Sequence, residues 1–373
     1  MNVCFVAHFA YGALTDSTAG HIGGVERQTA LMARWLAERG HQVSVVTWSE
    51  GPAGDETIDG VRVIKACRRD AGLPGIRFLH PRWTSLNQAM ARADADLYYQ
   101  NCAESVTGQV ALWARRNGRK FVFSVASDPE CDPALEILSS VRERWLYRYG
   151  LRAADAVLVQ TRAQAEALAC GFGIDGAVHP MPCRVAHDHD VETLLACRSP
   201  TPRVLWIGRL MPVKNLDRLF AVAQRLPHVH FDVVGGADQD TAYAARVLAR
   251  GEALANITMH GRLAGDCIAK LLLQSWMLLC TSDHEGFPNT FLESWGHARP
   301  VVTTVDPDGL IQELDLGAAG AHDEALADAI STYCTSPERL EAHSRGAYRY
   351  FEEHHTVEHA MSRFEATFQT VLG

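Results

Sequence analysis

Short apolar runs alternate with amphipathic segments along the first 170 residues of the chain. The segment 25–40, "VERQTALMARWLAERG", places Val25, Met32 and Leu36 on one helical stripe and ends at Gly40, which is typical of a helix. Strands are predicted at "VCFVAHF", "HQVSVVTW", "DLYYQ", "KFVFSVA" and "DAVLVQ", and further helices at 105–117, 134–151 and "TRAQAEALACG". This alternation predicts βαβ units and a parallel sheet covered by helices.

The alternation stops in a proline-containing polar stretch and then starts again. Strands are predicted at "RVLWIG", "VHFDVVGG", "ITMHG" and "WMLLCTS", and helices at 215–226, 239–251, 265–275 and "NTFLESWGHA". We therefore expect an α/β fold of two Rossmann-like, doubly wound domains that face each other across a cleft lined by strand ends. The predicted divisions are a first domain 1–182, a hinge 183–201, a second domain 202–345, and a last helix 346–373.

Composition limits the classes of protein that fit this pattern. The chain has 373 residues, of which 47% are apolar and 21% charged, which is typical of a globular protein of two domains. Residues 1–180 contain equal numbers of basic and acidic side chains, so the net charge of −9 lies in the rest of the chain. We expect no nucleic-acid partner. Arginine-dense patches at 62–82, 115–120 and 142–152 are suited either to an anionic lipid surface or acidic acceptor, or to solvated helix faces.

Cysteine and histidine spacing argues against structural metal. The ten cysteines are scattered through predicted strands and loops and form no secreted-type framework, so reduced thiols are expected. "HPMPCRVAHDH", with His179, Cys183, His187 and His189, matches no zinc spacing. The start of the chain lacks a basic signal-peptide pattern, and no apolar run is long enough to cross a membrane. A cytoplasmic protein is predicted.

Three junctions between a loop and a helix are candidate ligand sites. Gly23 and Gly24 precede a predicted helix, where paired glycines and free N–H groups suit an anion, although a plain flexible turn fits nearly as well. In "WIGRLMPVKNLDRL", Arg209 follows a strand and Lys214 precedes a helix, an arrangement suited either to a diphosphate or to ordinary surface charge.

The third junction is "CTSDHEGFPNTFLESW". Glu285 is expected in the loop after a strand, and Glu293 in the first turns of the next helix, so both carboxylates can accept hydrogen bonds from vicinal hydroxyls. Gly286 and Pro288 shape the backbone between them. The alternative is a solvated loop charge at Glu285 and a favourable helix-start charge at Glu293.

These motifs, in this order, resemble the retaining glycosyltransferases of family 4, which have the two-domain GT-B fold. The resemblance rests on "GGVER", "GRLMPVKN", "VVGG", "ITMHGRL" and the E-x7-E pattern "EGFPNTFLE", and it covers nearly the whole chain. It implies that Arg209 and Lys214 hold the donor diphosphate, that Glu293 binds the ribose hydroxyls, and that Glu285 contacts the donor sugar. By the same resemblance, further donor contacts come from Gly23, Gly24, Gly208, Phe287, Pro288, Asn289 and Thr290. It also implies that domain 1–182 binds the acceptor, that domain 202–345 binds the donor, and that the last helix, 346–373, crosses back to the first domain.

The sequence departs from the family pattern at two places. Many relatives have a His-Asp pair after the strand that corresponds to "KFVFSV", whereas this chain reads Ala126-Ser127-Asp128-Pro129-Glu130. We hypothesise that Asp128 takes over part of that catalytic role near the sugar hydroxyls. In "Ala298-Arg299-Pro300", relatives often have glycine at the position of Ala298, a change expected to affect helix packing more than chemistry.

The expected function is transfer of a hexose-type sugar, with retention, from a nucleotide sugar to a hydroxyl of a glycan, a lipid-linked or a small-molecule acceptor. The resemblance implies a hexosyltransferase without metal or other cofactor, with bacterial polysaccharide or glycoconjugate synthesis as one setting and the inner membrane face as one location. The alternatives are a nucleotide-sugar epimerase of the same fold and a catalytically silent sugar-nucleotide-binding subunit. Donor hydrolysis distinguishes the silent subunit from a transferase.

Overall fold

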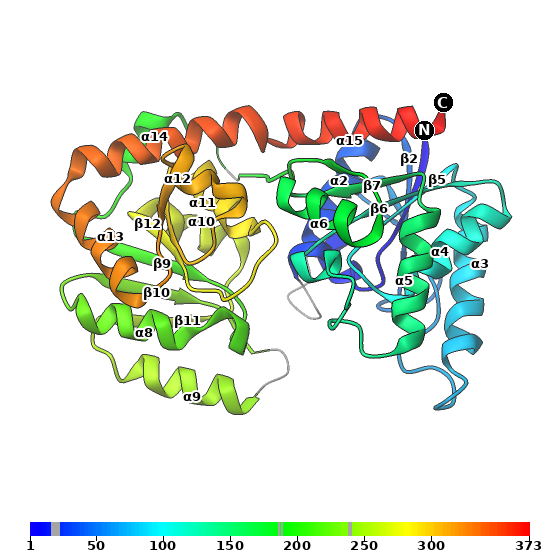
Figure 1. The fold of residues 1–373 in the computed structure, drawn as a ribbon, viewed down its shortest axis with the longest axis horizontal. Coiled ribbons are helices and arrows are strands. Elements are labelled where there is room, and N and C mark those ends of the chain that lie inside the picture. The colour runs from blue at the N-terminus through cyan, green and yellow to red at the C-terminus, as the bar shows by residue number, and fades with distance from the viewer. Residues whose placement is uncertain (16–22, 186, 188, 238–240) are drawn as a thin grey trace. The chain divides into compact units, whose positions relative to one another are not determined.

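The computed structural model describes residues 1–15, 23–185, 187, 189–237 and 241–373. It divides into two compact units, and each is a sheet with helices packed on it (Figure 1). Unit 1 comprises Met1–Pro182 and Val357–Gly373, and unit 2 comprises Cys183–Thr356. The described part of the predicted hinge 183–201 lies in unit 2, and positions 186 and 188 of it fall outside the described residues. In the part of the chain that is described, no helix is long and apolar enough to span a membrane.

The sheet of unit 1 has the strand order β3-β4-β2-β1-β5-β6-β7-β8. Every neighbouring pair is parallel except β3 with β4. Its central strands are almost wholly buried, because helices cover both faces of a parallel sheet. The strands are β1 (Asn2–Val6), β2 (Gln42–Thr47), β3 (Glu56–Ile58), β4 (Val61–Lys65), β5 (Leu97–Asn101), β6 (Lys120–Ser124), β7 (Ala156–Val159) and β8 (Gly176–Val178).

The helices predicted in unit 1 are present, one of them with a later start, and two others, α1 and α3, were not predicted. They are α1 (Tyr11–Leu14), α2 (Gly24–Glu38), α3 (Thr84–Ala93), α4 (Ser105–Arg116), α5 (Val141–Ala153), α6 (Arg162–Phe172) and α15 (Val357–Leu372). Helix α5 begins later than the predicted residue 134, because Ser140 and Glu143 form a capping box. The Glu143 N–H donates to Ser140 Oγ over 3.2 Å, and the Ser140 N–H donates to Glu143 Oε2 over 3.1 Å.

The last helix, α15, belongs to the core of unit 1. The ring of Phe368 lies 5.7 Å from that of Tyr99, and the ring of Phe364 lies 5.0 Å from that of His179. The preceding helix, α14 (Pro337–His354), lies in unit 2. Its Phe351 is fully buried there.

The sheet of unit 2 is parallel throughout, in the order β11-β10-β9-β12-β13-β14. The chain order reverses between β9 and β12, and ligands of doubly wound sheets bind at such a switch point. The strands are β9 (Arg203–Ile207), β10 (His230–Val234), β11 (Ile257–Gly261), β12 (Met277–Cys280), β13 (Val301–Thr303) and β14 (Gly317–Ala319). The prediction of two α/β domains with parallel sheets is confirmed.

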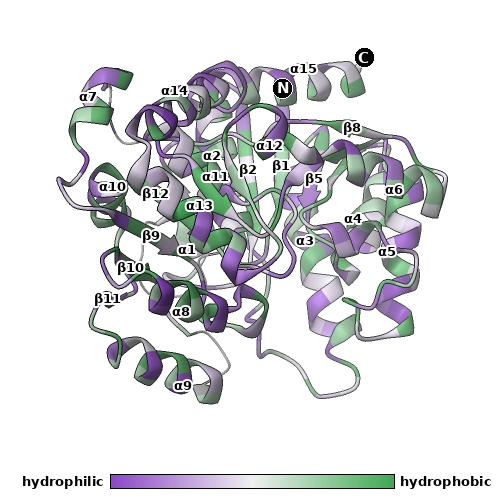
Figure 2. Cartoon of the chain, turned by 60° about the vertical axis from the view of Figure 1, so that its left-hand side comes forward, coloured by the Kyte–Doolittle hydropathy of each residue, from purple (hydrophilic) through white to green (hydrophobic). Residues whose placement is uncertain are grey.

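Helices of unit 2 pack an apolar face on this sheet and expose a polar one, as the mixed green and purple of α8 and α13 illustrate (Figure 2). On α8, for example, Leu216, Leu219 and Phe220 are buried. Besides α14, the helices are α7 (Val191–Ala196), α8 (Leu216–Arg225), α9 (Thr241–Glu252), α10 (Gly265–Gln274), α11 (Asn289–Gly296), α12 (Leu310–Glu313) and α13 (Asp323–Thr335). Residues 239 and 240 of the helix predicted at 239–251 lie outside the described part.

A buried arginine ties three segments of unit 2 together. Arg299 has no exposed surface, and its guanidinium donates to the carbonyl oxygens of Leu272 (3.0 Å), Leu273 (2.6 Å) and Leu194 (2.7 Å). Leu272 and Leu273 end helix α10, whose last carbonyls have no partner within the helix. Arg299 therefore caps α10 and joins it to α7.

Candidate functional site

Two loops at the switch point of unit 2 are linked by a cation and a carboxylate. The Lys214 ammonium is ion-paired with Glu285 Oε1, which also accepts a hydrogen bond of 2.6 Å from the Ser282 hydroxyl. Lys214 follows β9 through the short helical turn Pro212–Lys214, and Glu285 follows the neighbouring strand β12. The structure thus brings together two residues predicted to contact the donor, at the sheet edge where ligands bind.

Buried polar contacts fix the position of these loops. Trp206 Nε1 donates to Thr281 Oγ1 over 3.0 Å, and the Thr281 hydroxyl donates to the Lys214 carbonyl over 2.7 Å. The Asp283 N–H donates to the Val213 carbonyl over 2.9 Å. Because Trp206 and Thr281 are buried, these bonds hold the backbone of Lys214 beside the loop that carries Glu285.

Arg209 is exposed just beyond the end of β9, after Gly208. The backbone here approaches β10 closely, since the Gly208 N–H donates to the Val234 carbonyl over 3.0 Å. A Cβ atom on Gly235 would lie 1.8 Å from the Gly208 oxygen, so only glycine fits that position. The "VVGG" motif therefore allows the turn that presents Arg209.

Helix α11 begins at Asn289, directly after the buried Phe287 and Pro288. The Phe287 ring lies 6.0 Å from that of Trp295, which fixes the start of the helix. Thr290 and Glu293 are half-buried. Burial, followed by the charge of nearby Glu293, raises the pKa of the Cys183 thiol. The predicted roles of these residues toward a donor stay predictions.

The remaining predicted site residues, Gly23, Gly24 and Asp128, lie in unit 1. The N–H of Gly23 was expected to be open to an anion, but it donates to Glu26 Oε2 over 2.9 Å. Gly24 is exposed at the first position of α2. Asp128 is exposed, and its Oδ1 accepts a hydrogen bond of 2.8 Å from the Gln164 side-chain amide.

The sequence pattern did not single out Glu130, a buried acid two residues after Asp128. Glu130 is only 1% exposed and accepts hydrogen bonds from the Ala126 N–H (3.2 Å) and the Ser127 hydroxyl (3.0 Å). Burial raises the pKa of Glu130 to about 7. The proline before Glu130 marked this stretch as a turn, but no periodic pattern indicated which of its acids is buried.

Glu130 should make the stability of the enzyme depend on pH. Between the ordinary glutamate value of 4.5 and about 7, the folded state keeps a proton that the unfolded state has lost, so stability falls as pH rises through this window. Glu130→Gln stays neutral, and its unfolding free energy should gain about 2–3 kcal/mol relative to wild type between pH 5 and pH 8. Chemical denaturation at both pH values measures this change. The exposed Glu136→Gln is the control, and a Glu130→Gln difference that is constant with pH would contradict the assignment.

Candidate metal ligands do not cluster in the part of either unit that the structure describes. Across the described ranges, no group of three or more His, Cys, Asp or Glu side chains is placed to hold a metal ion. His179 instead contacts Thr367 Oγ1 of α15 through Nε2, at 2.8 Å.

Comparison with known proteins gives the family. Residues 23–184 match the model of a glycosyl transferase 4-like domain, and residues 201–336 match that of the glycosyl transferases group 1. The chain belongs to the group 1 glycosyltransferases. The predicted resemblance to the family 4 glycosyltransferases is confirmed, and the protein is a glycosyltransferase. A search of curated proteins gives no match.

Solved structures support the GT-B fold of this glycosyltransferase. Sucrose-phosphate synthase from Thermosynechococcus elongatus is 18% identical, with a TM-score of 0.77 over 99% of this chain and 98% of its own. HepE from Anabaena, solved in complex with UDP-glucose, is 18% identical with a TM-score of 0.74, covering 99% of each chain. A glycosyltransferase from Rickettsia africae is 16% identical with a TM-score of 0.72, covering 99% of this chain and 98% of its own.

Proposed function

We propose that this glycosyltransferase moves a hexose-type sugar from a nucleotide sugar to an acceptor hydroxyl, with retention and without a metal ion. The observation that carries the proposal is the Lys214–Glu285 pair at the switch point of unit 2. A cation beside a carboxylate provides a partner both for the donor diphosphate and for sugar hydroxyls. HepE, which was solved with UDP-glucose, supports a nucleotide-sugar donor.

In the proposed reaction, the acceptor oxygen bonds to the anomeric carbon on the face from which the diphosphate leaves. The bond from that carbon to the phosphate oxygen breaks, and the hydroxyl proton passes to the released diphosphate. Arg209 and Lys214 stabilise the negative charge that develops on the leaving group, as fixed cations do in other transferases. Glu285 holds the sugar, and Glu293 accepts hydrogen bonds from the ribose hydroxyls. Asp128 contacts the sugar hydroxyls in place of the family histidine.

Glu293→Ala should weaken donor binding. We expect one of UDP-, GDP-, ADP- or dTDP-sugars, assayed with EDTA, to stabilise the wild type by about 2.7 kcal/mol at 100 times its Kd. Loss of hydrogen bonds to a charged acceptor weakens binding roughly tenfold to a hundredfold, so the stabilisation of the variant at the same donor concentration should fall to between about 1.4 and about 0.4 kcal/mol. The exposed Glu313→Ala in the same unit is the control.

The same experiment distinguishes the alternatives. A silent binding subunit gives the thermal shift but releases no free sugar from the donor, whereas a transferase hydrolyses some donor slowly. An epimerase converts the donor without any acceptor. If no nucleotide sugar stabilises the wild type, or if Glu293→Ala binds as well as wild type, the donor assignment is wrong.

A further inference from the structure

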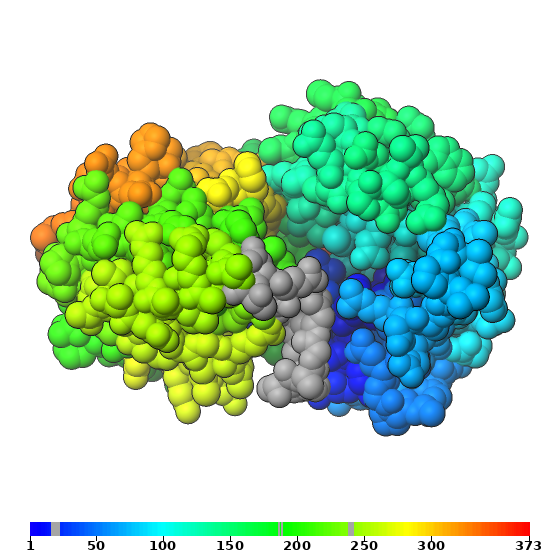
Figure 3. Space-filling model, turned by 90° about the horizontal axis from the view of Figure 1, so that it is seen from below, coloured from blue at the N-terminus to red at the C-terminus, as the bar shows by residue number. Residues whose placement is uncertain are grey.

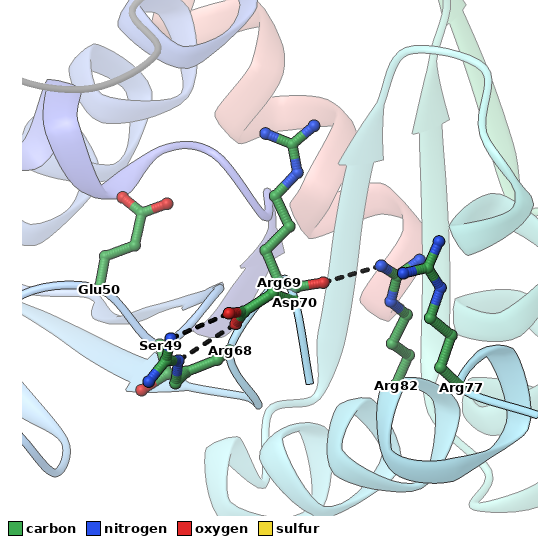
Figure 4. Close-up of a pocket in the computed structure, with 7 residues that line it drawn as sticks. All are labelled: Ser49, Glu50, Arg68, Arg69, Asp70, Arg77 and Arg82. Atoms are coloured by element: carbon green, nitrogen blue, oxygen red, sulfur yellow. Dashed lines mark hydrogen bonds and ion pairs between the residues drawn. The ribbon is translucent and has the colours of Figure 1, made fainter. Parts of the chain in front are cut away.

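Unit 1 contains a cavity of about 560 Å³, here called the arginine cavity (Figure 4). It lies beyond β2 and β4, where loops from both strands meet the chain that leads into α3. The residues that line it are Ser49, Glu50, Arg68, Arg69, Asp70, Arg77 and Arg82. The lining therefore includes four arginines and two carboxylates.

The charges in the arginine cavity are not balanced. Arg68 is neutralised by Asp70, through hydrogen bonds of 3.1 Å and 2.9 Å to its two carboxylate oxygens. Within the described ranges, the guanidinium groups of Arg69 and Arg77 make no hydrogen bond or ion pair with protein. Since only Glu50 opposes Arg69, Arg77 and Arg82, the cavity keeps an excess of positive charge.

The backbone holds two of these arginines on one side. The chain from Phe78 to Trp83 is a turn kinked at His80, whose backbone is extended, and the Arg82 N–H donates to the Arg77 carbonyl over 3.2 Å across the kink. This turn brings the Arg77 and Arg82 side chains together (Figure 4). Gly72, at φ +88°, lets the preceding loop pack closely, because a Cβ there would lie 2.4 Å from Pro81 Cδ.

A second cavity of about 480 Å³ adjoins the first and shares Arg69 and Arg82 with it. Its other lining residues come from the loops after β1 and β2, from Phe78, from the start of α4 and the residues before it, and from the segment before and into α5. In the space-filling view, light-blue residues near position 75 and green-cyan residues near 137 border this hollow of unit 1 (Figure 3). The two cavities form a continuous binding surface with arginines at their junction.

The aromatic residues of the second cavity hold the arginines in place. The Arg69 guanidinium lies 5.0 Å from the centre of the Phe9 ring, and that of Arg82 lies 5.8 Å from Trp48. Three buried polar atoms here have no hydrogen-bond partner in the described part of the chain: His8 Nε2, Trp48 Nε1 and Arg82 Nε. Buried polar atoms without partners are rare in proteins, and they are expected where a ligand completes the bonding.

We propose that the arginine cavity binds a phosphate-type anionic group on the acceptor, and that the second cavity holds the neutral part of the same molecule. Arginine forks bind two phosphate oxygens at once, and aromatic and polar walls suit a sugar ring. The inference rests on the proposed transfer and names the acceptor class. Transfer itself proceeds at a hydroxyl of the acceptor, so the phosphate is bound and not changed.

The phosphate has two possible sources, a soluble phosphorylated sugar or a lipid headgroup. Leu73, Ile76 and Leu79, close to Arg77 in the chain, are more than half exposed, which is compatible with a lipid surface. Both sources share the same recognition chemistry, and the acceptor experiment separates them.

The binding experiment uses inorganic phosphate as the probe, with affinity measured by calorimetry. Arg69→Ala/Arg77→Ala removes two exposed side chains without touching the core, and phosphate affinity should fall at least about tenfold. The matched control is Arg115→Ala/Arg116→Ala, exposed at the other end of α4, and its affinity should equal that of the wild type. Equal phosphate affinity in both double variants overturns the proposal. Displacement of phosphate by the donor nucleotide also overturns it, because the cavity then serves the donor.

The acceptor experiment compares a monosaccharide with its phosphate ester, and phosphatidylcholine vesicles with and without phosphatidic acid. A soluble acceptor is supported if transfer to the phosphate ester is faster than to the monosaccharide and if Arg69→Ala/Arg77→Ala loses this advantage. A lipid-borne acceptor is supported if the protein binds only the vesicles that contain phosphatidic acid. Equal use of neutral and phosphorylated acceptors, without vesicle binding, overturns the proposal. Thermal shifts with the donor are measured in parallel. Absence of a shift in the wild type contradicts the proposed function, whereas a shift that persists in the variant means that its loss of transfer comes from the acceptor.

Discussion

Lys214→Ala should lower kcat/KM for sugar transfer by roughly 100- to 1000-fold while the protein stays folded. The ammonium group lies at the switch point of unit 2 and is held there by the bond from Thr281 to the Lys214 carbonyl. A fixed cation where charge develops on a leaving diphosphate stabilises the transition state more than the ground state, and one such group is typically worth this factor. Initial rates at saturating and limiting donor measure the effect on kcat and on KM.

The matched control for this variant is Lys270→Ala. Lys270 is exposed on α10 of the same unit, so its removal changes the net charge equally but should leave the rate unchanged. A rate for Lys214→Ala within threefold of wild type would rule out the proposed role.

A double variant tests whether Lys214 and Glu285 act together. Because the two side chains form one ion pair, the losses in Lys214→Ala and Glu285→Ala should be less than additive in the double variant. Full additivity would mean that the pair separates when the donor binds.

Arg299→Met should be the most destabilising substitution of a charged residue in unit 2. It removes the guanidinium donor from the buried carbonyls of Leu194 and Leu273, while the Leu272 carbonyl keeps its hydrogen bonds from Ser275, and loss of a buried charged partner costs about 3–5 kcal/mol. The unfolding transition of unit 2 should therefore shift down by roughly 10 °C in calorimetry. Burial, followed by the charge of Arg198, lowers the pKa of Arg299 to about 9, but the group stays cationic at neutral pH.

Two further variants test the cause of this loss. Arg299→Lys should recover little, because an ammonium lacks the planar fork that reaches several carbonyls. Arg225→Met removes an exposed arginine paired with the exposed Glu324 and should change stability by less than about 1 kcal/mol. If the free energy of unfolding of Arg299→Met lies within 1 kcal/mol of that of the wild type, the freed carbonyls have found other donors and the capping role is not required.

The central strands and most helices were predictable because their patterns are local, whereas five strands were not predicted: β3, β4, β8, β13 and β14. Alternating apolar runs and helical stripes located β9, α8, β12 and α11 within a few residues, and both members of the E-x7-E motif follow β12 as expected. The pairing of Lys214 with Glu285 was not predictable from local pattern, because the two residues are 71 positions apart and only the sheet order places them together.

Other features depend on tertiary contacts that no periodicity records. The Gly23 N–H donates to the Glu26 carboxylate at the place where an anion site was expected. The sequence alone is compatible with either arrangement. The arginines of 62–82 were compatible both with an anionic partner and with solvated helix faces, because the kinked turn that brings Arg77 and Arg82 together has no sequence period of its own. The departure at Ala298 was expected to affect helix packing, but no pattern indicated that the neighbouring Arg299 would donate to carbonyls of α7 and α10.

The chain passes from unit 1 to unit 2 after Pro182 and returns after Thr356, and at these crossings the Cys183 N–H donates to the His355 carbonyl over 2.9 Å. Exchange of unit 2 with that of a relative therefore requires two splice points. A chimera cut only once, near residue 182, would combine a foreign α15 with the native sheet, and His179 and Tyr99 would face side chains that did not evolve with them. Grafting Cys183–Thr356 as an insert keeps both cores native, so recombination can replace unit 2 while unit 1 is left intact.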